Sequence, residues 1–185
     1  MIERSGTSSG REERAAVSRR VVLIPGCLAL LPEYGSLTDP VAELRAAVDA
    51  ATSWLGEEVE IVATDQGRRV AEAVLAARMS NDADTERSVL VVLNGSACRT
   101  EKAPGFLDGR AEAFDESIRA ALVAPAPQAL RRIDGGLARE LWADVAVLPQ
   151  LAELLTGPGA DARTVSVDHD AAPFGVQYWV IRWEI

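Results

Sequence analysis

Runs of consecutive aliphatic residues, without polar alternation, mark the strands that this chain is expected to form. The longest is Val89–Leu93, the run at Val21–Ile24 has the same character, and Val59–Ala63 is a further predicted strand with one charged residue, Glu60. Uninterrupted aliphatic runs are typical of strands that are covered on both faces, as in a parallel sheet. Between these runs, apolar residues recur at helical spacing over about 40–54 and 67–79. The alternation of strands and helices therefore predicts a mostly parallel sheet.

The second half of the chain is expected to add helices and then a pair of strands. The patterns predict, in order, a helix over about 110–123, a run of helices over about 128–155, and strands at 164–167 and 176–183. The residues between the two strands are too few for a crossover helix, so these strands are expected to pair antiparallel. The predicted fold class is α/β: a three-layer sandwich with a mostly parallel sheet, an antiparallel C-terminal strand pair and helices on both faces.

Composition is that of a single globular domain. The chain has 185 residues, of which 48% are hydrophobic and 25% charged. Residues 1–19 are rich in Ser, Gly, Arg and Glu and are expected to form a disordered tail, which leaves residues 20–185 for the α/β domain. No apolar run approaches the roughly 20 residues of a membrane span, and no secretion signal is visible. Two cysteines far apart in the sequence make no disulfide framework, so a cytoplasmic location is expected.

The charge balance narrows the class of partner. The net charge is -9, and binding to phosphate backbones or anionic lipids needs a basic surface. Nucleic acids and membranes are therefore not expected as partners. A small-molecule ligand is the expected partner, and a homodimer is an alternative use of the same surface.

Polar residues follow each of the first three predicted strands. Cys27 follows the first, Asp65 the second, and the segment Asn94–Lys102 the third. Open α/β sheets bind ligands outside the carboxyl ends of their strands, so a pocket is expected where these segments meet. The candidate ligand-binding residues are Asn94, Ser96, Arg99, Thr100, Glu101, Lys102, His169 and Asp170. Lys102 is the only lysine, and Arg99 and Lys102 are expected to hold a carboxylate or a phosphate.

A metal site is a second interpretation of the same edge. Cys27, Asp65 and His169, the only histidine, carry donor atoms suited to zinc or to Fe(II). The alternative is that Cys27 is a small buried hydrophobe and His169 a turn residue. Ser96 lacks the flanking glycines of a nucleophile elbow, and no spacing supports a dyad of Cys98 with His169.

Three stretches together resemble a known family. They are Ile24-Pro25 with the residues up to Glu33, Asn94–Gly105, and Ala172–Trp179. In this order they resemble alanine-rich actinobacterial proteins that are similar to the catalytic subunit of class III extradiol (aromatic ring-opening) dioxygenases. The resemblance implies a three-layer α/β fold and, in the enzymes, non-haem Fe(II) held by two histidines and a carboxylate. Here Gly26 stands where the first histidine is expected, and no histidine follows the second strand.

Three hypotheses follow. The first is a dioxygenase-like protein without the iron site, which binds a small anionic or aromatic ligand at the strand ends. The second is an active metal-dependent oxidoreductase, dioxygenase or hydrolase with altered ligands, namely Cys27, Asp65 and His169. The third is a non-catalytic structural or interaction protein, in which residues 94–110 form a loop closed by its own ion pairs or a dimer contact.

Overall fold

A computed structural model describes residues 19–35, 38–78, 87–124, 126–157 and 164–185. Its strands are β1 (Arg20–Ile24), β2 (Val59–Val62), β3 (Ser88–Val92), β4 (Thr164–Ala171) and β5 (Tyr178–Glu184), and its α-helices are α1 (Ala42–Ser53), α2 (Asp65–Ala77), α3 (Ala111–Val123), α4 (Gly135–Glu140) and α5 (Leu148–Leu154). The tail predicted over residues 1–19 lies outside the described residues, apart from Arg19. None of the helices in the described ranges combines the length and apolar character needed to cross a membrane.

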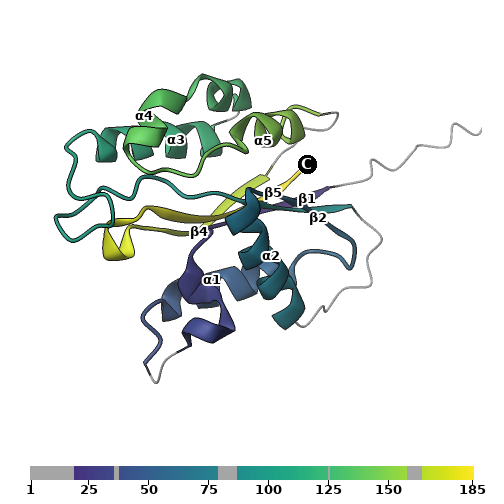
Figure 1. Cartoon of the computed structure of the whole chain (residues 1–185). Helices are drawn as coiled ribbons and strands as arrows, with labels where there is room; N and C mark the ends of the chain where they lie inside the picture. The colour runs from purple at the N-terminus through teal and green to yellow at the C-terminus, as the bar shows by residue number, and fades with distance from the viewer. Residues whose placement is uncertain (1–18, 36–37, 79–86, 125, 158–163) are drawn as a thin grey trace, which may run out of the picture.

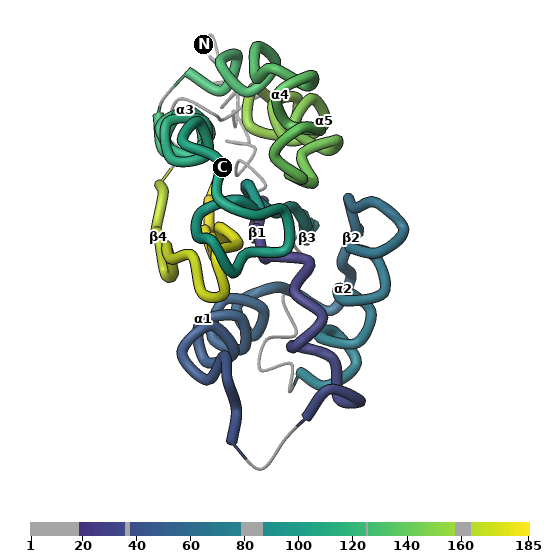
Figure 2. Tube along the Cα trace, turned by 60° about the vertical axis from the view of Figure 1, so that its left-hand side comes forward, coloured from purple at the N-terminus to yellow at the C-terminus, as the bar shows by residue number. Residues whose placement is uncertain are grey.

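The five strands form one sheet in the order β2-β3-β1-β5-β4. β1, β2 and β3 are parallel, and β5 runs antiparallel to both β1 and β4. In both views α1 and α2 lie on one side of the sheet, and α3, α4 and α5 lie on the other (Figures 1 and 2). The predicted fold class, an α/β sandwich with an antiparallel C-terminal pair, is confirmed.

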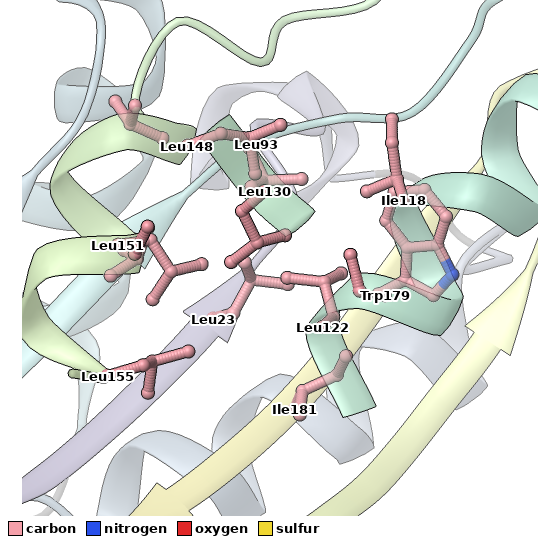
Figure 3. Close-up of a cluster of buried hydrophobic side chains, with 14 of the residues drawn as sticks. Leu23, Leu93, Ile118, Leu122, Leu130, Leu148, Leu151, Leu155, Trp179 and Ile181 are labelled. Atoms are coloured by element: carbon pink, nitrogen blue, oxygen red, sulfur yellow. The ribbon is translucent and has the colours of Figure 1, made fainter. Parts of the chain in front are cut away.

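Burial on both faces explains why the central strands lack polar alternation. Every residue of β3 is buried. Leu23, Val91 and Leu93 point into the cluster beneath α3 and α5, where Ile118 and Leu122 pack (Figure 3). The intervening residues of β1 and β3 belong to the opposite cluster, against α1 and α2. Both faces of the strands are therefore hydrophobic because helices cover both.

The strand predicted at 164–167 is longer than its pattern indicated. β4 continues to Ala171, so His169 and Asp170 lie in the strand and pair with Val180 and Trp179. The predicted end of the strand at Val167 and the interpretation of His169 as a turn residue are wrong, because polar residues were treated as loop residues. β4 is an edge strand, where charged residues are tolerated. Its polar side chains are paired with arginines: Asp168 with Arg182, and Asp170 with Arg119.

Candidate functional site: a pocket at the strand ends

A pocket of about 790 Å³ opens at the carboxyl ends of β1, β2 and β3. Its lining comes from the residues after β1 (Gly26, Cys27, Leu28, Ala29), the start of α2 (Thr64, Asp65, Gln66), the residues after β3 (Asn94, Ala97), and two later segments (Trp142 with Asp144, and Phe174 with Val176 and Tyr178). Small-molecule sites commonly measure about 300–1,000 Å³ and lie at this edge of parallel sheets. Size and position therefore make this pocket the candidate site.

Asn94 and Asp144 hold the strand ends together. The backbone N–H of Gly26, after β1, donates to Asn94 Oδ1 at 2.8 Å. The backbone N–H of Asn94, after β3, donates to the carbonyl of Asp144 at 3.0 Å. The hydroxyl of Thr64, after β2, donates to Asp144 Oδ2 at 2.7 Å. Since each bond joins the end of a strand to another segment, the base of the pocket is fixed by directed contacts.

One wall carries a thiol and a phenol. Cys27 is 5% exposed and Tyr178 is 7% exposed, and both line the pocket. Burial raises the pKa of the Tyr178 hydroxyl, and the neighbouring Cys27 thiol, to which the hydroxyl is hydrogen-bonded, raises it further. Tyr178 is therefore neutral at physiological pH and offers the pocket a polar group without charge.

Two exposed aromatic side chains stand at the mouth of the pocket. Trp142 is 64% exposed and Phe174 is 57% exposed. Both adopt a left-handed backbone conformation, with φ of 55° and 58°, and Phe106 is the only other non-glycine residue of the described chain that does so. This conformation is unfavourable for bulky side chains. Backbone strain of this kind clusters at active sites and ligand-binding sites.

Trp142 occupies a position that normally belongs to glycine. Leu141 is the C-cap of α4, so Trp142 is the first residue beyond it. The N–H of Ala143 donates to the carbonyl of Ala138 at 2.9 Å, and the N–H of Trp142 to that of Arg139 at 3.3 Å. This pair of bonds defines a Schellman motif, whose left-handed residue is usually glycine. The indole is thus presented at the pocket at a cost in backbone energy.

This cost is measurable with two substitutions that remove the same ring. We expect Trp142→Gly to be more stable than Trp142→Ala by about 1 kcal/mol, because glycine adopts a positive φ without a steric penalty. Urea unfolding of the two variants measures the difference. Equal stabilities would mean that the backbone at Trp142 is not strained.

Ser96 and Arg99 lie in a buried network rather than in the pocket. The backbone N–H and the hydroxyl of Ser96 donate to the two oxygens of Asp115 at 2.7 and 2.6 Å. Arg99 Nη1 lies 3.2 Å from Asp115 Oδ2 and 3.1 Å from Gln177 Oε1. Burial raises the pKa of Asp115, and the hydrogen bonds from Ser96 and Arg99 offset part of this rise. The Ser96 hydroxyl is therefore bonded to a carboxylate, and Arg99 is bonded to Asp115, to Gln177 and, at 3.4 Å, to Glu112.

The remaining residues of the predicted loop also lie away from the pocket. Thr100, Glu101 and Lys102 are exposed, and none of them is among the residues that line it. Of the candidate ligand-binding residues, Asn94 alone faces the pocket. The segment after β3 turns to run beside the connection between β4 and β5 (Figure 2), through bonds such as Arg99 N–H to the Gly175 carbonyl.

A smaller cleft of about 220 Å³ between α3 and the sheet holds Arg99 and Asp170. Asp170 pairs with Arg119 there and accepts a hydrogen bond from Gln177 Nε2 at 2.9 Å. His169 is adjacent in sequence but faces the opposite side of the sheet, and its Nε2 is buried without a hydrogen-bond partner among the described residues. His169 and Asp170 therefore do not lie in the same site, and neither of them lines the strand-end pocket.

The three predicted metal ligands do not converge. Cys27 and Asp65 line the pocket, whereas His169 lies in β4, two strands away from β1. No group of three His, Cys, Asp or Glu side chains within the described ranges is placed to hold a metal ion. With one histidine in the chain, the donor set of the dioxygenase iron site does not fit. Cys98, a further thiol, is buried, and burial raises its pKa above the usual range.

Sequence reasoning missed Asp144, Trp142 and Tyr178. Asp144 and Trp142 lie in a segment expected only to contain helices, and Tyr178 lies in the strand predicted at 176–183. A tryptophan directly after the end of a short helix, where glycine is usual, was a signal that could have indicated a functional position.

In comparisons with known proteins, no family model and no curated protein matches this chain. The fold and pocket therefore define the class, an α/β sandwich with a strand-end pocket.

Proposed function

We propose that this protein binds a small organic molecule with an aromatic ring in the strand-end pocket. The observation that carries the proposal is the placement of Trp142 and Phe174, two exposed rings on strained backbone, at the mouth of a pocket of about 790 Å³. Aromatic side chains in such positions stack on flat ligands at little entropic cost, since they have few rotatable bonds. The resemblance to ring-opening dioxygenases agrees with an aromatic ligand, and the iron site is no part of the proposal.

The charge of the lining favours the aromatic ligand over the anionic one. None of the described residues that line the pocket is basic, while Asp65 and Asp144 are acidic. The two cations expected to hold an anion are elsewhere: Arg99 is paired with Asp115, and Lys102 is exposed on its turn. An anion entering the pocket would meet two carboxylates without a compensating positive side chain, which is unfavourable.

Removal of the Trp142 ring tests the proposal. We expect Trp142→Ala to weaken the binding of aromatic ligands at least tenfold, because one face of the stacking site is lost. The measurement is an NMR titration with a library of aromatic fragments, following the indole N–H signals of the four tryptophans. In the wild type, the Trp142 signal, assigned by its absence from the variant, should move.

Phe106 provides a matched control. It is also an exposed aromatic residue with a left-handed backbone, 74% exposed with φ of 62°, but it does not line the pocket. Phe106→Ala should therefore leave fragment binding unchanged. If no fragment moves the Trp142 signal, or if the Phe106 and Trp142 variants bind equally well, the proposed function is wrong. Loss of binding in the Phe106 variant alone would instead favour the third hypothesis, an interaction surface on the loop.

A further inference from the structure

The acidic side chains of the pocket differ from most aspartates of the described chain in having no cationic partner. Asp39, Asp108, Asp115, Asp168 and Asp170 each pair with an arginine. Asp65 and Asp144 form no ion pair with a described residue, although they lie in the wall of a pocket. A carboxylate that faces a cavity can accept a charge-assisted hydrogen bond from a cationic ligand, which is stronger than a bond from a neutral donor.

A hydrogen bond joins the two segments that carry these carboxylates. Asp65 is the first residue of α2, and Thr64 directly before it donates its hydroxyl to Asp144 Oδ2. That bond uses one oxygen of the Asp144 carboxylate. The other oxygen of Asp144 and both carboxylate oxygens of Asp65 accept no hydrogen bond from a described residue. The pocket therefore presents acceptors for the N–H groups of a ligand.

The start of α2 does not reverse the charge of this wall. A helix N-terminus carries the equivalent of roughly +0.5 elementary charge, and α2 begins at the pocket. The two carboxylates bring two negative charges, and no described lining residue brings a positive one. The sum is negative, so the electrostatic preference is for a cation.

The aromatic rings at the mouth favour the same charge. Ring faces attract cations, and the attraction strengthens where water is partly excluded. Trp142 and Phe174 line the pocket that Asp65 and Asp144 also line. We propose that the ligand is an organic cation, an ammonium or amidinium group carried on an aromatic ring, with the charged group at Asp65 and Asp144 and the ring between Trp142 and Phe174. This inference rests on the proposed function and names the chemical class of its ligand.

Probes that share a phenylethyl group and carry a positive, a neutral or a negative terminal group test the inference. The probes are 2-phenylethylamine, 2-phenylethanol and 3-phenylpropanoate, with the naphthyl analogue of each. We expect the amines to bind at least tenfold more tightly than the alcohols, and the carboxylates to bind most weakly. The readout is calorimetry together with the Trp142 indole signal. Raising the salt concentration from about 20 mM to about 500 mM should weaken the binding of the amines and leave that of the alcohols unchanged.

Substitutions of the two aspartates test where the charged group of the ligand binds. Asp65→Asn and Asp144→Asn should each lower amine affinity about tenfold, because a charge-assisted contact becomes a neutral one, and each should lower the affinity for the alcohols by a smaller factor. Asp49→Asn, at an exposed position on α1, is the control. Alcohol affinity also reports whether each variant still folds its pocket.

The outcomes separate the two proposals. If amines and alcohols bind equally at the Trp142 signal, with no effect of salt or of the two substitutions, the pocket stands and the cation inference is overturned. Tightest binding by the carboxylates would overturn it as well. If no probe moves the Trp142 signal, the proposed function fails and the inference fails with it.

Discussion

Replacing Asp115 with alanine is expected to lower the free energy of unfolding by about 3–4 kcal/mol. Asp115 is 2% exposed. It accepts two hydrogen bonds from Ser96 and pairs with Arg99. Alanine would leave the Ser96 donors buried without an acceptor, and a partly buried guanidinium without this partner. Urea unfolding measures the loss, and Asp49→Ala on the surface is the control.

The pH dependence of the same site has a definite sign. Burial raises the pKa of Asp115 above its ordinary value of 3.8, in spite of the bonds from Ser96 and Arg99. An acid with a higher pKa in the folded state stabilises the protein most at low pH, and this contribution is lost as pH rises from the unfolded value through the folded one. The stability advantage of the wild type over Asp115→Asn should therefore shrink as pH rises above about 4. An advantage that grows with pH would contradict the raised pKa.

Gly175→Ala is expected to cost about 2–4 kcal/mol of stability. Gly175 has φ of 74°, in the left-handed region. A methyl group there would lie 2.5 Å from Thr100 Oγ1 and 2.6 Å from Ala103 Cβ. The carbonyl of Gly175 also accepts the hydrogen bond from Arg99 N–H, at 3.0 Å. Two causes therefore add: backbone strain and a collision with the turn after β3.

Gly109→Ala is the matched control for this prediction. A methyl group at Gly109 would meet no atom within 4 Å, so its stability should stay near that of the wild type. Thermal unfolding of both variants gives the comparison. Because Phe174 precedes Gly175, the Gly175 variant should also bind aromatic fragments less well. Equal melting temperatures for the two variants would contradict the packing described for this turn.

The sheet could be predicted from the sequence because its central strands bury both faces. Val89–Leu93 has no polar residue to mark an exposed side, and the structure covers it with helices on both sides. The end of β4 could not be predicted in the same way. Its polar residues Asp168 and Asp170 are held by Arg182 and Arg119, partners distant in the sequence. The hydrophobic pattern of a sequence does not reveal strand residues whose side chains are stabilised by ion pairs.

The position of the site could be predicted, but most of its lining could not. Cys27, Asp65 and Asn94 meet at one edge because three parallel strands end there. Arg99 and Lys102 follow the same strand as Asn94, yet the chain leaves the pocket after Ala97, and the N–H of Arg99 donates to the Gly175 carbonyl. The number of residues between a side chain and the end of its strand does not show in which direction the chain turns. Trp142 and Asp144 reach the pocket from a segment more than forty residues further on, through the contacts of Asp144 with Thr64 and Asn94.

The most direct test is a crystal structure of the protein soaked with 2-phenylethylamine. The account predicts ligand density in the strand-end pocket, with the ring between Trp142 and Phe174 and the ammonium group within hydrogen-bond distance of Asp65 or Asp144. Density in the cleft beside Arg99 and Arg119, or an empty strand-end pocket in crystals that hold the ligand elsewhere, would contradict it.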